Sequence, residues 1–311
     1  MSFIERALEQ LKPVPESAPT QPASTEHAKP VIQKARPAVP AGTGSEVPCR
    51  ADRILSIDVL RLRSAGVIGP EDEERRIAEE YRLIKRPLLK AIMQADAGKL
   101  GNVVVVTSAV PGEGKTFTSI NLALSLALER DIQVVLVDGD VAKRDITHVF
   151  GLDEEPGLLD AAGDTSVGLE QALLRTNVAS LYVMPAGNQQ LEATEILASE
   201  RTASLLAELA AEPRRIVLID SPPLLATTEA GVLVSLAGQV VLVVKASETP
   251  QNVVTSAIET IAEDKPVSLV LNQVLSVPER HYGYYYGGYG SYGEEQGKAA
   301  SRKRTQDDSK G

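Results

Sequence analysis

A glycine-rich run between an apolar segment and a helical one carries the residues with the clearest chemical meaning. The run reads SAVPGEGKT, from Ser108 to Thr116. The backbone amides of such a loop and the start of the following helix can surround phosphate oxygens. Lys115 can then reach the β and γ phosphates, and the Thr116 hydroxyl can bind Mg²⁺. Ala109 stands in place of the first glycine of the usual pattern, where a small residue suffices. The run predicts a nucleotide site, with a chance glycine turn as the alternative. The expected nucleotide contacts are Pro111, Gly112, Glu113, Gly114, Lys115, Thr116 and Phe117.

Three aspartates follow apolar segments that are typical of buried strands. Asp138 and Asp140 end the run VVLVDGD, and Asp220 ends the strand part of IVLIDSPP. The carboxyl ends of parallel strands meet at one edge of a sheet, where ligands collect. We therefore expect the three carboxylates beside the phosphate loop, although aspartates at such positions also cap helices and turns.

Six of the eight tyrosines fall within eleven residues near the C-terminus, in the run HYGYYYGGYGSYG. The run contains no Val, Ile or Leu and is followed by a polar segment, so we expect exposed phenols and not a buried strand. A self-associating, low-complexity tail is the alternative. A nucleotide loop on the same chain favours a role as phosphate acceptors. The candidates are Tyr282, Tyr284, Tyr285, Tyr286, Tyr289 and Tyr292.

The strands and helices that carry the loop and the aspartates are expected from Asn102 onward, where apolar runs start to alternate with helical patterns. Runs that are aliphatic throughout are typical of strands buried on both faces. The pattern predicts an α/β fold with a doubly wound, mostly parallel sheet and flanking helices. The expected strands are residues 103–107, 134–138, 181–185, 216–220, 240–245 and 267–272.

The part before this sheet divides into a helix, a linker and a charged extension. Apolar residues at helical spacing predict an amphipathic helix that ends at Pro13, and eight of the 19 prolines then fall between Pro13 and Pro48. Residues 52–65 and 71–97 have helical patterns, with Pro87 expected to kink or restart the second. The predicted organisation is a helix at 1–12, a disordered linker at 13–50, a nucleotide-binding domain at 51–275 and a flexible tail at 276–311.

Composition excludes several classes of protein. The formal net charge of −10 argues against a general affinity for nucleic acid. Cys49 is the single cysteine, so no internal disulfide can form and a reducing compartment is expected. No run approaches the ~18 to 20 apolar residues that span a bilayer, and the N-terminus lacks a signal-peptide pattern. We expect a cytoplasmic protein that reaches a membrane through a partner or a surface helix.

The combined motifs closely resemble a known family. The PGEGKT loop, the VVLVDGD and IVLIDSPP strands and the terminal tyrosine cluster are similar to those of the bacterial tyrosine kinases (BY-kinases) of polysaccharide export. Within that family the chain is most similar to the exosortase-associated tyrosine autokinases, in which the kinase is a separate soluble chain. The resemblance runs from about residue 52 to Tyr292 and includes the first helix. It implies a P-loop NTPase fold, ATP and Mg²⁺ as cofactors, and autophosphorylation of the C-terminal tyrosines.

The resemblance also assigns roles to single residues. Lys115 and Thr116 would hold the phosphates and Mg²⁺, and Asp220 would order Mg²⁺ and its water shell. Asp138 would accept the tyrosine proton while Asp140 helps to place the metal. The family often has an arginine where this chain has Ala142, with Lys143 and Arg144 just beyond it.

A helix motif and one further residue also match contacts in the family. Glu79, Arg82 and Lys85 in EEYRLIK match an ExxRxxR helix motif that packs one subunit against the next, with Lys85 in place of the last arginine. A solvated charged face is the alternative. Asn272 lies where relatives contact the nucleotide base, and is equally ordinary as a residue at the end of a strand.

We expect a tyrosine autokinase that regulates exopolysaccharide or capsule synthesis and export. The resemblance implies a ring-like homo-oligomer that phosphorylates in trans, a membrane polysaccharide co-polymerase or chain-length determinant protein, and a protein tyrosine phosphatase. It implies recruitment to the inner face of the cell membrane through a partner. The main alternative is a partition or septum-positioning ATPase. That class carries a lysine where this loop has Val110, and it has no use for six tyrosines. An intact set of loop and carboxylate residues speaks against a third alternative, a non-catalytic regulatory subunit.

Overall fold

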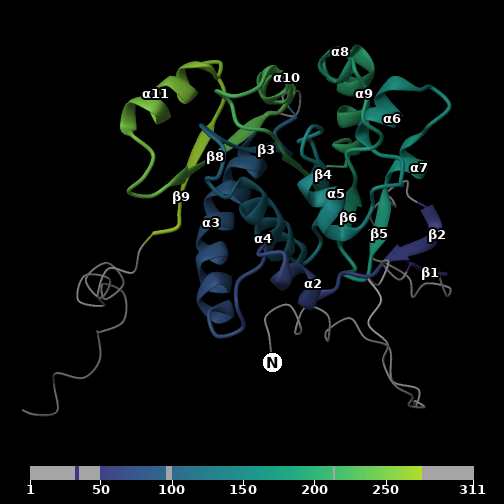
Figure 1. Ribbon diagram of the computed structural model, residues 1–311, viewed down its shortest axis with the longest axis horizontal. Helices are drawn as coiled ribbons and strands as arrows, with labels where there is room; N and C mark the ends of the chain where they lie inside the picture. Colours follow the sequence, from purple (N-terminus) through teal and green to yellow (C-terminus); the bar gives the residue numbers. More distant parts are fainter. Residues whose placement is uncertain (1–31, 35–49, 96–99, 213, 275–311) are drawn as a thin grey trace, which may run out of the picture. The chain divides into compact units, whose positions relative to one another are not determined.

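A twisted sheet is the centre of the computed structural model, which describes residues 32–34, 50–95, 100–212 and 214–274 (Figure 1). One compact unit ends at Asn272 and contains the helices and strands described below, and a second unit starts at Gln273. In the described residues the sheet has nine strands, in the order β1-β2-β5-β6-β4-β7-β3-β8-β9. The strands are β1 (Ile32–Lys34), β2 (Arg50–Leu55), β3 (Val103–Ser108), β4 (Gln133–Asp138), β5 (Leu174–Thr176), β6 (Leu181–Met184), β7 (Arg215–Asp220), β8 (Gln239–Lys245) and β9 (Val267–Asn272).

The strand pairs are parallel except at two places. β1 pairs with β2 antiparallel, and β5 pairs with β6 antiparallel. The central strands β4, β7, β3 and β8 pair parallel with one another. The predicted mostly parallel, doubly wound sheet is therefore confirmed.

Helices cover both faces of the sheet. They are α2 (Val59–Ser64), α3 (Glu74–Gln94), α4 (Lys115–Ala127), α5 (Asp145–Phe150), α6 (Leu158–Gly163), α7 (Leu169–Ala172), α8 (Ala193–Leu197), α9 (Glu200–Leu209), α10 (Thr228–Leu236) and α11 (Gln251–Glu259). Strand β3 shows why the apolar runs are unbroken, because Val103 and Val105 enter one buried cluster while Val104 and Val106 enter the other. Helices α6 to α11 contribute to the first cluster, and α2 to α5 contribute to the second.

The region before β3 departs from the sequence-based expectation. Residues 52–65 were expected to be helical, but β2 occupies Arg50–Leu55 and pairs with β5. Helix α2 starts only after Asp58, whose side chain accepts a hydrogen bond from Leu60 N at 2.9 Å. The charged run has the period of a helix, whereas pairing of its first residues with β1 and β5 decides their structure. Helix α3 runs through Pro87 without a break, because its packing against α4 continues on both sides of the proline.

Parts of the predicted domain organisation lie outside the described residues. These parts are the helix at 1–12, the tyrosine tail at 276–311 and all of the linker at 13–50 except 32–34 and 50. Residues 32–34 form β1, within the stretch that was predicted to be a linker. They are free of proline and can therefore offer backbone amides to β2. Among the described residues, no helix is both long and apolar enough to cross a bilayer.

Candidate active site

The phosphate loop joins the central strand β3 to helix α4. Gly112 has a φ of 85° and Gly114 a φ of 90°, a left-handed conformation that glycine adopts without steric cost. Helix α4 then starts at Lys115, so the first amides of the helix follow the loop directly. Strands β7 and β8 flank β3, which brings the loop to the same sheet edge as the carboxyl ends of those strands.

Lysine and carboxylates meet at this edge. Lys115 Nζ lies 2.8 Å from Asp140 Oδ2, and the Thr116 hydroxyl donates to Asp220 Oδ2 at 2.8 Å. Asp138 and Asp220 are direct register partners on the neighbouring strands β4 and β7. The structure thus brings together the lysine, the threonine and the three aspartates that were singled out from the sequence.

Gly139 makes this close arrangement possible. Its backbone N–H donates to Asp220 O at 2.7 Å. A Cβ atom at this position would lie 2.7 Å from Ile219 Cγ2 and 2.8 Å from Asp220 O, which is too close for any side chain. The glycine in DGD therefore allows the ends of β4 and β7 to approach each other.

The charged groups of the cluster are buried, and their pKa values reflect it. Burial raises the pKa of Asp138 to about 7 and that of Asp220 to about 6. Burial by itself lowers the pKa of Lys115, but the negative charges of Asp220 and Asp140 have the larger effect together and raise that pKa above its ordinary value. Three carboxylates near one lysine leave an excess of negative charge, which suits a cation.

Two hydroxyl-bearing residues that the sequence did not single out hold the carboxylates. Ser119 Oγ lies 2.9 Å from Asp220 Oδ1, and Thr147 Oγ1 donates to Asp138 Oδ2 at 2.6 Å. Asp138 Oδ1 is buried and has no hydrogen-bond partner within the described residues. Such an atom is costly unless a ligand or an ion completes its hydrogen bonding. Ser119 lies one helical turn after Lys115, and that spacing was the available signal.

Glu113 and Asn272 brace the loop. The Glu113 carboxylate is buried and accepts from Val110 N at 2.8 Å, Thr249 Oγ1 at 2.6 Å and Lys245 N at 3.1 Å. Asn272 Nδ2 donates to Glu113 O at 2.8 Å. The predicted contact of Glu113 with a nucleotide is therefore limited to its backbone, because its side chain holds the turn after β8.

Phe117 also points elsewhere. Its ring contacts Tyr81 of α3, with ring centroids 6.5 Å apart, and it packs against the core on that face. The side chain of Phe117 therefore fixes α4 to α3, and its backbone is the part that follows the loop.

The cations after Asp140 have different settings. Lys143 is exposed, while its backbone N–H donates to Asp140 Oδ1 at 3.3 Å. Arg144 has a left-handed backbone with a φ of 56° and donates from its guanidinium to Asp153 O at 3.0 Å. Of the two residues, Lys143 is exposed and Arg144 is half-buried.

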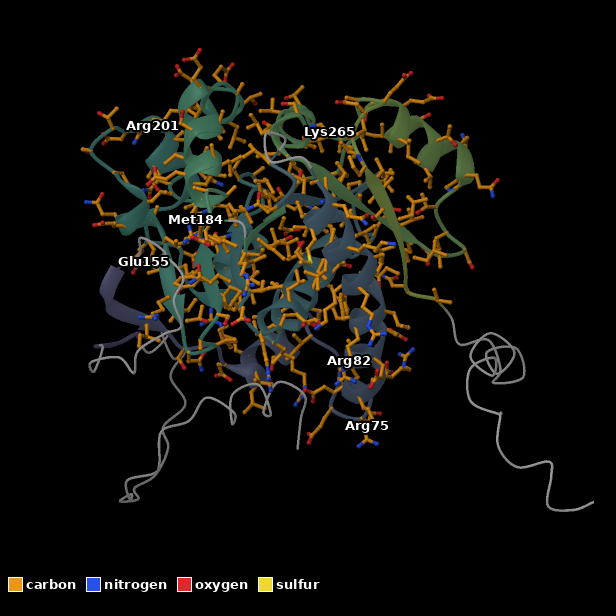
Figure 2. The ribbon with its side chains drawn as sticks, turned by 180° about the vertical axis from the view of Figure 1, so that it is seen from behind. Arg75, Arg82, Glu155, Met184, Arg201 and Lys265 are labelled. Atoms are coloured by element: carbon orange, nitrogen blue, oxygen red, sulfur yellow. The ribbon has the colours of Figure 1, made fainter. Side chains whose placement is uncertain are left out.

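The residues of the predicted subunit-contact motif lie in two different environments. Glu79 and Arg82 form an exposed ion pair on α3, and Arg82 lies at the periphery of the compact unit (Figure 2). Lys85 is buried instead, and its Nζ lies 2.7 Å from Ser125 O and 2.7 Å from Glu129 Oε1. The Lys85 ammonium group thus joins α3 to α4 within one molecule, and the exposed residues of the motif are Glu79 and Arg82.

The oxygen atoms beside the phosphate loop are of the kind that binds Mg²⁺. Within the described ranges, no three His, Cys, Asp or Glu side chains converge on one point as a ready-made metal centre. Mg²⁺ is commonly held by one or two carboxylates together with substrate phosphates and water. Thr116 and Asp220, in direct contact with each other, and the excess negative charge fit that mode of binding.

The loop, the lysine and the carboxylates on a mostly parallel sheet define a nucleotide-binding P-loop protein. The family model described as AAA domain matches residues 101–276. The chain is 30% identical over 222 residues to tyrosine-protein kinase YwqD of Bacillus subtilis, a match that covers 71% of this chain and 91% of that protein. It is 35% identical over 211 residues to EpsB of Ralstonia nicotianae, covering 67% of this chain but only 27% of EpsB.

A solved structure agrees with these relatives. The VpsO kinase domain is 30% identical, with a TM-score of 0.51, and the match covers 63% of this chain and 100% of that domain. The chain belongs to the bacterial tyrosine-kinase family.

Proposed function

We propose that this chain is an ATP-dependent protein-tyrosine autokinase that phosphorylates the tyrosines of its own C-terminal segment. The observation that carries the proposal is the buried cluster of Lys115, Asp138, Asp140 and Asp220 beside the phosphate loop, on the same chain as six clustered tyrosines. Membership of a tyrosine-kinase family supports the activity. The six tyrosines themselves lie outside the described residues.

Each residue of the cluster has a proposed task. The loop amides and Lys115 bind the phosphates of ATP, and Thr116 with Asp220 and Asp140 would hold Mg²⁺. When bound, Mg²⁺ supplies charge neutralisation for the phosphoryl group. Phosphoryl transfer depends mainly on positioning and on charge stabilisation, and the rigid loop and the buried lysine provide both.

Asp138 is the proposed proton acceptor. A free phenol has a pKa of about 10 and an ordinary aspartate a pKa of about 3.9, which makes that carboxylate a weak base. Burial raises the pKa of Asp138 to about 7 and so brings it closer to that of the phenol. Asp138 Oδ1, which is buried and lacks a hydrogen-bond partner in the described residues, is the oxygen that would accept the proton of the incoming hydroxyl.

We further propose that the activity serves exopolysaccharide or capsule chain synthesis and export. The expected assembly is a ring-like homo-oligomer in which one subunit phosphorylates the next. Glu79 and Arg82 are available for such contacts because both are exposed on α3. A membrane polysaccharide co-polymerase or chain-length determinant protein would recruit the chain to the inner face of the cell membrane. A protein tyrosine phosphatase would reset it.

Mixing two variants of the full chain tests the activity and its direction. One variant carries Lys115→Met with an intact tail, and the other has an intact site with Phe at all six tail positions. Incubation with Mg²⁺ and γ-labelled ATP is expected to label only the Lys115→Met chain, and only in the mixture. ATP hydrolysis without labelled tyrosine would instead support a partition-type ATPase.

A further inference from the structure

Thr147, on the short helix α5, lies between the ends of two neighbouring strands. Its side chain is fully buried. Both its backbone N–H and its hydroxyl donate to Asp138 Oδ2, at 2.8 and 2.6 Å. The same hydroxyl oxygen accepts a hydrogen bond from Ala186 N, just after β6, at 3.0 Å. One hydroxyl therefore connects the carboxylate at the end of β4 to the backbone that follows β6.

This geometry fixes the direction of the hydroxyl proton. A threonine hydroxyl has one proton to donate. The Ala186 N–H can only donate, so it occupies a lone pair of Oγ1, and the hydroxyl proton is directed to the Asp138 carboxylate. Two donors then converge on Oδ2. The carboxylate cannot rotate without losing both hydrogen bonds, and Oδ1 remains as the oxygen without a partner in the described part of the chain.

We propose that Thr147 is a positioning residue for phosphoryl transfer, which fixes Asp138 so that Oδ1 faces the incoming phenol. The inference rests on the proposed function, in which Asp138 accepts the phenolic proton. A base that is itself oriented by a third group is a recurring arrangement in nucleophile activation. Because two donors hold Oδ2, the orientation of Oδ1 is fixed before any phenol arrives. The carboxylate therefore needs less ordering in the reaction step.

The test uses full-length Thr147→Val and Thr147→Ser, each also combined with Asp138→Asn. Valine has the shape of threonine without its hydroxyl, and serine keeps the hydroxyl. Single-turnover autophosphorylation gives the rate of transfer, and titration with ATP gives Kd. Should Thr147→Val not fold, Thr147→Ala removes the same hydroxyl with less apolar bulk, and retained ATP binding verifies the fold of every variant.

Thr147→Val is expected to slow transfer by roughly 10- to 100-fold, a part of the ~10²- to 10⁴-fold that a general base contributes. Its Kd for ATP should stay within about twofold, because Thr147 touches neither the phosphate loop nor Lys115. Thr147→Ser should restore most of the rate. In the Asp138→Asn background, Thr147→Val should have no further effect, because it acts through Asp138.

Three outcomes would overturn the inference. If Thr147→Val transfers phosphate at the rate of the wild type, Thr147 has no role in positioning Asp138. If Thr147→Val slows transfer by the same factor in the Asp138→Asn background, its role is merely structural. A parallel loss of ATP affinity also indicates a structural role. In all three cases the wild type still labels its tail, so the proposed function stands. If the wild type forms no phosphotyrosine, the proposed function fails, and the inference fails with it.

Discussion

Lys85→Met is expected to destabilise the single molecule and to leave contacts between molecules unchanged. The Lys85 ammonium lies 2.7 Å from Ser125 O and 2.7 Å from Glu129 Oε1. Ser125 lies in the last turn of α4, where carbonyls lack the usual helical donor. Methionine keeps the apolar stem between α3 and α4 but leaves this carbonyl without the lysine. Glu129 is partly exposed, so water can replace the lysine at that carboxylate.

The size of the expected loss in stability follows from the hydrogen bond between the charged Lys85 ammonium group and the buried Ser125 carbonyl. Such a bond contributes about 1.5–3 kcal/mol to the free energy of unfolding. For a chain of this size, Tm should fall by roughly 3–12 °C. Urea unfolding without nucleotide, at two protein concentrations, measures the loss. Lys90→Met is the matched control, because Lys90 is exposed on the same helix and its loss should cost less than about 0.5 kcal/mol.

A concentration-dependent effect would contradict this account. If Lys85→Met unfolds like the wild type but lowers the mass of an oligomer, Lys85 contacts a second subunit after all. The Lys85 ammonium group would then not serve mainly to join α3 to α4 of one molecule.

Three other perturbations test two parts of the site and the tyrosine tail. Gly139→Ala should lower the free energy of unfolding in urea by about 1–3 kcal/mol, because the new Cβ would lie 2.7 Å from Ile219 Cγ2. Gly231→Ala is the control and should not destabilise the protein, because the space around Gly231 is open. Glu113→Gln should raise the Kd for ATP, measured by calorimetry, by about tenfold, since an amide cannot accept hydrogen bonds from all three donors. An unchanged Kd would show that these hydrogen bonds are not needed to hold the phosphate loop. Phosphorylation of six tail tyrosines adds on the order of −9 to −12 charges, so Mg-ATP should lower the solution mass of an oligomer. A chain with Phe at all six positions should keep its mass, and equal dissociation of both would exclude the tail as the switch.

The sheet and the phosphate loop were predictable because their sequence signals are local. Unbroken aliphatic runs such as that of β3 reflect burial on both faces, and the glycines of the loop reflect backbone angles that other residues avoid. The aspartates at the ends of β4 and β7 could be placed at one edge because the strands are parallel. Strands of three residues, such as β1 and β5, are too short to show a period.

The supporting side chains could not be predicted in the same way. Ser119 and Thr147 are ordinary residues of helices by pattern, and their contacts with Asp220 and Asp138 exist only because distant segments meet. Lys85 looks like part of a charged stripe, and its burial depends on where α4 packs. Glu113 lies within the loop motif, but two of its side-chain partners, Lys245 N and Thr249 Oγ1, are more than 130 residues further along the chain, at the end of β8 and just beyond it.

A map of phosphotyrosine on the full chain tests the proposed autokinase activity directly. Purified wild type and Lys115→Met are incubated with Mg²⁺ and γ-labelled ATP, and the labelled residues are identified by mass spectrometry. Phosphate is expected on the cluster from Tyr282 to Tyr292 in the wild type and not in Lys115→Met, with both proteins folded. A tail that stays unlabelled while ATP is hydrolysed, or equal labelling of the two proteins, would contradict that expectation.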